Sequence, residues 1–461
     1  MQFDIKATHP EYAQWVPIWT FLRDSNDGEV AVKGKGEQYL PMKSGIKAIS
    51  DVKKKQDAYD RYKFRAEFPD ILGPTIRGSA GLIHKTPSVI ELPSALEPLR
   101  ERATMDGLTL EQLHMRMTTE LLMVGRYGLM PGIDDSGDVF LARYRAETIR
   151  NWDETDGEPD YVVLDESAHV RDPATNKWSK LEAYREVYLD DGGMVSRVWT
   201  RSDSKDEFIP GEEERATIRG RDALDYLPFS FVGSKDLTAT PDDAPLKGLA
   251  SLAHRAYVLD ADYVNTLHMT SEPTPWVSGV DKKHAPTTIG AAALWVLSAA
   301  DAKAGLLEFS GQGAGAQAQA IEKTLQRAMM FGAQLFADNT RTAESGDALE
   351  TRLGHQTSPL KLIAESSARG LEHALKNAAV WVGADPDQVV VTPNTEFFDR
   401  QLSPQEITAL VQGWMSGAYS RKTLFQNLQG GGIVDEEKQF EDELEEIQDD
   451  DPLMGGGDDG I

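Results

Sequence analysis

The sequence predicts an α+β fold, because the spacing of its apolar residues changes twice along the chain. Apolar side chains recur at helical spacing up to about residue 125, alternate with polar ones between Val139 and Thr200, and return to helical spacing after Pro245. With 461 residues, 40% of them hydrophobic, the chain is long enough to bury a large core. We expect a mixed N-terminal region followed by long helices.

Two helices are predicted in the N-terminal region. The first covers residues 51–68 and places Tyr59 and Tyr62 on one face. The second opens at Thr109, whose spacing to Gln112 is that of a capping box. Both are expected to pack an apolar face on the core.

Four runs with a period of two predict strands in the following region. Acidic turns that contain glycine separate the runs, and residues 190–193 read Asp-Asp-Gly-Gly, a good hairpin turn. We therefore expect a meandering antiparallel sheet. The predicted strands are Val139–Tyr144, Tyr161–Leu164, Ala183–Leu189 and Met194–Thr200.

Two long helices that bracket a small β insert are predicted after Pro245. The helices cover residues 246–270 and 316–337, and the second carries Ile321 and Leu325 on one apolar stripe. The insert holds two strand-like runs, Leu294–Ser298 and Gly305–Phe309, and a glycine-alanine stretch, Gly311–Ala316, that is expected to be a flexible linker.

The remaining chain is predicted to be mostly helical. A polar, turn-rich stretch covers residues 338–354, a helix begins at Pro359, and a strand covers Val389–Thr392. Two shorter helices are expected to start at Ser403, where proline follows at the first helical position, and at Ser420. The last dozen residues are acidic and rich in glycine, which indicates a solvated tail.

The charge balance narrows the possible partners. Seventy-five acidic and 48 basic side chains give a net charge of -27. Such a surface disfavours tight binding of nucleic acid, which requires lysine and arginine, but suits a wall that repels passing DNA and also suits plain solubility. The chain has no cysteine, no apolar run typical of a secretion signal and no apolar stretch long enough to cross a bilayer.

The sequence predicts no catalytic residue, metal or cofactor. Nucleotide-binding, zinc-protease and serine-hydrolase motifs are absent, so an ATPase motor is not expected. Acidic residues cluster at Asp134, Asp135 and Asp138 and again between Asp153 and Asp160. Neither cluster has the spacing of a calcium loop, and both are interpreted as turns between strands.

A series of short motifs resembles the portal proteins of tailed phages across nearly the whole chain. The order and spacing of the motifs carry the resemblance. They are Tyr144-x-x-Glu147-x-Ile149-x-Asn151-Trp152, Tyr184-Arg185-x-x-Tyr188-Leu189, Leu227-Pro228-Phe229, Pro273-x-Pro275-x-x-x-Gly279, Ser358-Pro359-Leu360-x-x-Ile363-Ala364 and Gly417-x-x-Ser420.

The resemblance implies the portal fold of wing, stem helices, clip and crown, assembled into a ring. Its regions are placed here in chain order. They are the α+β wing at 1–245, a stem helix at 246–270, the clip at 271–315, a second stem helix at 316–337, the tunnel loop at 338–354, a wing helix and strand at 355–400, the helical crown at 401–447 and an acidic flexible tail at 448–461.

The resemblance also implies a non-enzymatic function. Portal subunits form a homo-oligomeric ring, a dodecamer in this family, through which double-stranded DNA is packaged and ejected. The implied partners are the terminase large subunit, a head-tail adaptor, and the major capsid and scaffolding proteins. The implied location is the portal vertex of the virion, after assembly in the bacterial cytoplasm, with no membrane contact.

Two groups of site residues follow from the same layout. In the clip, Lys282, Lys283 and His284 are expected to meet terminase or the adaptor, or else form an ordinary basic turn. For the tunnel loop, the sequence leaves two alternatives: contact of its polar side chains with DNA phosphates, or pairing of its arginines with nearby glutamates. The tunnel-loop candidates are Asn339, Thr340, Arg341 and Arg352.

Two other functions remain alternatives. Another head-tail connector or a minor capsid protein would share the acidity and the absence of motifs, but the helix-clip-helix order disfavours it. The remote alternative is a metal-dependent nuclease that uses Asp134, Asp135 and Asp138.

Overall fold

The computed structural model divides the chain into two compact units, Met1–Thr395 and Glu396–Ile461. It mixes helices and sheets, which confirms the predicted α+β class. The residues that the structure describes are 3–134, 136–202, 207–218, 222–271, 274–281, 286, 288, 294–297, 300–307, 312–336, 346–395, 397, 404–430, 433–434 and 438–449.

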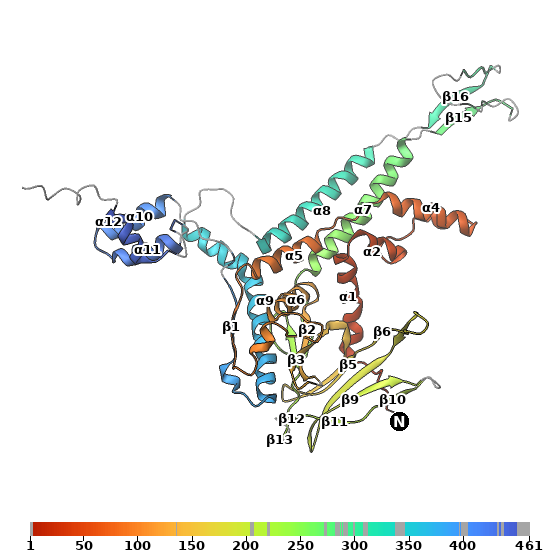
Figure 1. Cartoon of the computed structure of the whole chain (residues 1–461). Coiled ribbons are helices and arrows are strands. Elements are labelled where there is room, and N and C mark those ends of the chain that lie inside the picture. The colour runs from red at the N-terminus through yellow and green to blue at the C-terminus, as the bar shows by residue number, and fades with distance from the viewer. Residues whose placement is uncertain are drawn as a thin grey trace, which may run out of the picture. The chain divides into compact units, whose positions relative to one another are not determined.

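The helices of the first unit lie mainly to one side of its main sheet, and α7 and α8 project away from it (Figure 1). The capping box expected at Thr109 and Gln112 is present at the start of α6, and Gly125 ends this helix in the left-handed conformation. The helices are α1 (Pro10–Asn26), α2 (Glu29–Gly34), α3 (Ser44–Lys47), α4 (Val52–Arg65), α5 (Leu72–Ile83), α6 (Leu110–Val124), α7 (Lys247–Ser271), α8 (Gln312–Phe336) and α9 (Gly346–Trp381).

The main sheet is an antiparallel meander, as expected, but the first predicted strand, Val139–Tyr144, lies in a separate three-stranded sheet. Its strands lie in the order β10-β9-β8-β5-β4, and β11 also pairs with β9. The predicted hairpin turn joins β8 to β9, where Asp190 pairs with Gly193. The strands are β4 (Ile149–Thr155), β5 (Glu158–Asp165), β8 (Ala183–Asp190), β9 (Gly193–Arg201), β10 (Phe208–Pro210) and β11 (Glu214–Arg215).

Smaller sheets complete the first unit. One has three strands in the order β14-β2-β3, and α9 packs against it. Two-stranded pairs join β1 with β17, β6 with β7, β12 with β13 and β15 with β16. The strands are β1 (Val89–Glu91), β2 (Arg126–Ile133), β3 (Val139–Arg145), β6 (Ala168–Arg171), β7 (Trp178–Leu181), β12 (Thr217–Ile218), β13 (Asp222–Ala223), β14 (Ser230–Gly233), β15 (Thr274–Ser278), β16 (Lys303–Leu307) and β17 (Val390–Thr392).

Two apolar clusters form much of the core of the first unit. One fills the space beneath the sheets and includes Trp152, Val187 and Phe229. The other joins α4 to α7, where the predicted face of Tyr59 and Tyr62 is buried. The second cluster therefore fixes the root of α7 against the N-terminal helices.

The β insert differs from its prediction in the pairing of its strands. β16 contains the predicted run near Gly305, but its partner is β15 and not Leu294–Ser298, of which residues 294–297 are outside any strand. Pro275 concealed β15 in the sequence, since proline removes a ladder donor. A two-stranded sheet has free edges, so the missing donor is tolerated.

Two long helices begin earlier than predicted. α8 starts at Gln312, so Gly313 and Gly315 are helical and the expected flexible linker is wrong there. Alternating alanines offset the helical cost of these glycines. α9 starts at Gly346 and contains Pro359 in its interior, so residues 346–354, expected within the polar loop, are helical.

The second unit is helical over its described residues. Its helices are α10 (Pro404–Met415), α11 (Arg421–Gly430) and α12 (Phe440–Asp449). The helix predicted after Ser420 is α11, and the hydroxyl of Ser420 accepts a hydrogen bond from the amide of Thr423 at 3.2 Å. No helix in the described part of either unit has the length and apolarity to cross a membrane.

Candidate functional site

The candidate functional site is the pair formed by α7 and α8, with the β15–β16 hairpin beyond its end (Figure 1). Each helix has 25 residues, which corresponds to about 37 Å at 1.5 Å per residue. A Cβ atom at Gly248, near the start of α7, would lie 2.9 Å from the Phe331 ring, near the end of α8. The helices are therefore antiparallel and approach each other closely where α7 leaves the body of the unit.

The root of α7 is held firmly in the unit. Its buried side chains are mostly small, and they allow the neighbouring helices to approach. His254 lies within an aromatic group of Phe21, Tyr39 and Phe68, and its ring nitrogen lies 2.9 Å from the Ser25 hydroxyl. Burial lowers the pKa of His254 to about 4, so this histidine is neutral at pH 7.

The outer half of α7 and the whole of α8 between residues 313 and 332 are poorly covered by their own chain. Ala261 is the last buried residue of α7, and between residues 313 and 332 of α8 only Thr324 and Ala328 are buried. Met329 is 64% exposed and Met330 is 66% exposed. A helix of this length is stabilised mainly by packing of its apolar face, so α8 presents a surface suited to a partner.

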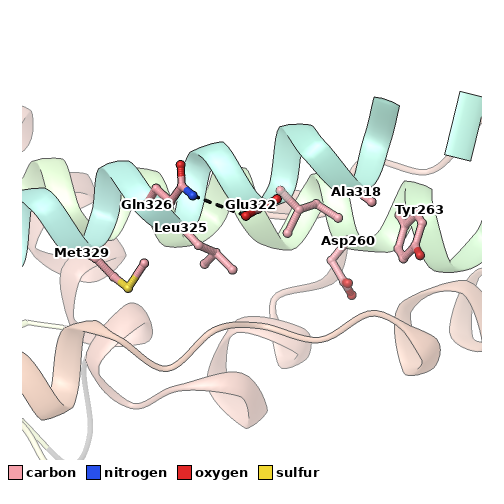
Figure 2. Close-up of a pocket in the computed structure, with 8 residues that line it drawn as sticks. Asp260, Tyr263, Ala318, Glu322, Leu325, Gln326 and Met329 are labelled. Atoms are coloured by element: carbon pink, nitrogen blue, oxygen red, sulfur yellow. Dashed lines mark hydrogen bonds between the residues drawn. The ribbon is translucent and has the colours of Figure 1, made fainter. Parts of the chain in front are cut away.

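A shallow groove of about 400 Å³ runs between the two helices (Figure 2). Three apolar side chains of α8, Ile321, Leu325 and Met329, recur every four residues and form its floor together with Ala318 and Tyr263. The spacing places them on one helical face. The groove is therefore an apolar strip and not an enclosed ligand cavity.

Both charged side chains that line the groove are acidic. Asp260 accepts a hydrogen bond from the backbone amide of Glu67 at 2.7 Å, and Glu322 accepts one from the Gln326 amide at 3.4 Å, the contact drawn in Figure 2. Neither carboxylate forms an ion pair with another described residue. The groove thus combines an apolar floor with uncompensated negative charge.

The hairpin carries exposed apolar side chains of its own. Trp276 pairs with Gly305 across the two strands, and a Cβ atom at Gly305 would lie 3.0 Å from the indole nitrogen. Trp276 is 43% exposed, and Leu306 on the opposite strand is also exposed. Tryptophan is one of the residues enriched where proteins contact each other.

The predicted site residues are only partly placed. Lys282, Lys283, His284, Asn339, Thr340 and Arg341 lie outside the described residues. Arg352 lies within α9, but its side chain is not among those that the structure describes. Their expected contacts with terminase, an adaptor or DNA remain predictions.

The acidic clusters near β3 and β5 form turns. Asp134 accepts hydrogen bonds from the amides of Ser136 and Asp138 at 2.9 and 3.0 Å, which is typical of an aspartate that stabilises a tight hairpin. Asp135 lies outside the described residues. Between β4 and β5, Asp156 and Gly157 both adopt positive φ, as a hairpin turn requires.

No group of three or more histidine or acidic side chains suited to a metal ion occurs among the described residues. The groove between α7 and α8 was not predicted, although the Ile321 and Leu325 stripe was visible as a helical face. Periodicity identifies such a face but does not show which part of it the chain itself covers.

The chain is similar to one family model and to several solved structures. A family described as a domain of unknown function (DUF4055) matches residues 245–382, a range from the start of α7 to just past the end of α9. A search of curated proteins finds no match.

Three solved structures come from gene transfer agent particles. A chain in the neck of an empty particle, computed with C6 symmetry, has 13% identity, covers 82% of this chain and 91% of its own, and gives a TM-score of 0.37. A chain in the virion of a native particle has 13% identity, coverage of 80% and 91%, and a TM-score of 0.38. A chain in the neck of a native particle, computed with C12 symmetry, has 14% identity, coverage of 80% and 90%, and a TM-score of 0.35.

Proposed function

We propose that this chain is a subunit of a tailed-phage portal, the ring through which double-stranded DNA enters and leaves the capsid. The proposal joins the motif resemblance to one structural observation. Two antiparallel 25-residue helices leave an α+β body and are followed outward by a small hairpin, in the order expected for stem and clip.

The exposed surface of the helix pair supports an assembly of several copies. A lone subunit leaves the groove and most of α8 in contact with water, at a free-energy cost that burial in an assembly removes. Contacts between two different surfaces of identical subunits are heterologous, and they close into a ring when the rotation between subunits permits. A dodecamer is the assembly proposed here.

The charge of the chain suits passage of DNA. At a net charge of -27 per subunit, most of a channel wall would repel phosphates, and this would keep the duplex from adhering. Contact with DNA is proposed for the segment that includes Arg341. The chain is proposed to be non-enzymatic, so the energy for DNA movement comes from a terminase that docks on the hairpin.

Further partners follow from this role. A head-tail adaptor would replace terminase on the hairpin after packaging, and the major capsid and scaffolding proteins would contact the body of the ring. The proposed location is the portal vertex of the virion, reached after assembly in the bacterial cytoplasm.

Electron microscopy and native mass measurement of the purified protein test the proposal. We expect closed rings with a central hole wide enough for duplex DNA. A protein that stays monomeric across all concentrations and salt conditions would contradict the portal role. Rings that lack such a hole would point instead to another component of the head-tail junction.

A further inference from the structure

The first turns of α4 extend beyond the helix that supports the rest of it. Tyr59 and Tyr62 bury the later turns against α7. Val52 lies seven residues before Tyr59 and therefore on the same face, yet it is 79% exposed. Figure 1 shows α4 continuing past α7. The apolar face of α4 thus runs on to a place where its own unit does not cover it.

The same turns carry concentrated positive charge. Lys53, Lys54 and Lys55 occupy the first turn of α4, which contains no acidic residue. Residues 29–65 hold ten basic and five acidic side chains within a chain of net charge -27. The N-terminal end of a helix is itself electropositive, so three lysines are unfavourable there unless an acidic surface faces them.

No acidic surface in the described part of their own unit faces these lysines, and the carboxylate of the N-cap Asp51 accepts a hydrogen bond from the amide of Lys54. None of the three forms an ion pair with a residue that the structure describes, whereas Lys33 and Lys63 nearby do. The uncovered end of α4 therefore combines an apolar side chain with unpaired cations. The α7–α8 groove has the complementary character, with an apolar floor and the carboxylates of Asp260 and Glu322.

The groove and the uncovered end of α4 cannot meet within one copy. Asp260 binds the amide of Glu67, just beyond the C-terminal end of α4. Val52 lies at the other end of this 14-residue helix, about 20 Å away at 1.5 Å per residue. Because the later turns of the helix are packed on α7, Val52 and the lysines are held away from the groove of their own chain.

We infer that the first turns of α4 of one copy dock in the α7–α8 groove of the next copy. This inference rests on the proposed ring, because it names the contact that joins adjacent subunits. Val52 packs on the floor formed by Ile321, Leu325 and Met329, and the lysines face Asp260 and Glu322. The two surfaces are different and lie at opposite ends of α4, so the contact is heterologous and suited to ring closure.

Disulfide trapping tests the contact directly, because the natural chain has no cysteine. Two separate variants, Val52→Cys and Met329→Cys, are mixed, assembled and oxidised. We expect a covalent dimer on a non-reducing gel that contains one chain of each variant. Val170→Cys in β6, which is also exposed, replaces Val52→Cys as the matched control and is expected to give no dimer with Met329→Cys.

Charge reversal provides an independent test. Lys53→Glu combined with Lys54→Glu is expected to raise the concentration needed for assembly by roughly tenfold or more, since like charges then face each other across the contact. Adding Glu322→Lys to this variant should restore part of the loss. Acidic residues favour the start of a helix, so the reversal does not unfold α4. Lys177→Glu with Lys180→Glu, on the β6–β7 hairpin, is the matched control.

The outcomes separate the inference from the proposed function. Specific cross-linking together with the charge effect supports the contact. Rings of the natural protein that give no cross-link and are indifferent to the α4 reversal would overturn the contact and leave the portal proposal intact. A natural protein that never assembles would overturn both.

Discussion

Gly370 determines how closely α9 approaches the sheet beneath it. A Cβ atom at this position would lie 2.4 Å from a methyl carbon of Val232 in β14. We expect Gly370→Ala to lower the free energy of unfolding by about 1–3 kcal/mol, because the sheet or the helix must shift to accommodate the methyl group. Urea unfolding of the variant measures the change.

A second glycine provides the control for this substitution. Gly81 lies in α5 and is exposed, and a Cβ atom added there would have no neighbour within 4 Å among the described residues. Gly81→Ala should raise stability by about 0.5–1 kcal/mol through its helical preference alone. Equal effects of the two substitutions would show that the α9–β14 contact does not require glycine.

His114 makes the stability of the first unit depend on pH. It is 3% exposed, its Nε2 atom has no hydrogen-bond partner among the described residues, and its ring lies edge-on to that of His84 at 4.8 Å. Burial lowers the pKa of His114 to about 3 and that of His84 to about 4. Both side chains are therefore neutral in the folded protein at pH 7.

The sign of the pH effect follows from these directions. Below about pH 6.5 the unfolded chain binds a proton at each histidine that the folded chain does not bind, so stability falls as the pH falls. For His114 the slope is about 1.4 kcal/mol per pH unit between pH 6 and 4. We expect His114→Gln to reduce the measured slope by that amount. An unchanged slope in urea unfolding across this range would contradict the assignment.

At the scale of elements, one arginine links α1 to α6 and to the short segment that follows β3. Arg23 of α1 pairs with Glu120 of α6 at 2.7 Å and also with Glu147, which follows β3. All three side chains are largely buried, and the two carboxylates hold the pKa of Arg23 above its ordinary value. The guanidinium group can satisfy both carboxylates at once because its donors form a planar fork.

Removal of Arg23 should therefore be costly. Arg23→Met leaves two carboxylates close together without this cation, and we expect a loss of about 3–5 kcal/mol in the free energy of unfolding. Arg23→Lys should recover only part of the loss, because an ammonium group lacks the fork geometry. Urea unfolding at pH 7 measures both changes, and full recovery by lysine would show that charge alone matters.

The sequence was sufficient to predict the positions of those helices and strands whose periodicity is strong and whose ends carry clear signals. α4, α6, β8, β9 and α7 lie close to their predicted positions for this reason. β2 was missed because it contains glycine and proline. Its partner β14 pairs only with residues 126–129, so Pro131 lies where β2 has a free edge and no ladder donor is needed there.

The candidate site depends on tertiary information that periodicity lacks. The stripe of Ile321 and Leu325 predicted a helix, but the same stripe fits a buried helix and an exposed one equally well. Val52 is exposed because α4 extends past its neighbour, and Met329 is exposed because it lies on a face of α8 that its own unit leaves uncovered. The lysine run at 53–55 was the available signal for α4, and its meaning required the position of that helix.

At the scale of the whole molecule, regions with different proposed roles carry different charge. Most of the chain is acidic, while residues 29–65 are basic. A subunit with positive charge confined to one surface can associate with acidic copies of itself and still present an acidic surface elsewhere. In the proposed ring, assembly and DNA passage require opposite local charges, and different elements of the chain would supply them.

This division predicts weak binding of DNA by the assembled ring. Binding that neutralises several phosphates falls steeply with salt, with a slope of about -0.9 per phosphate in a plot of log affinity against log salt concentration. Because α4 would be occupied by the neighbouring copy in the proposed ring, we expect no more than about two phosphate contacts and a correspondingly shallow slope between about 50 and 200 mM salt. Fluorescence anisotropy with a labelled duplex measures it. Arg341→Gln should reduce the slope by about one contact, and a slope that corresponds to about six or more contacts would show a surface made to hold DNA instead of letting it pass.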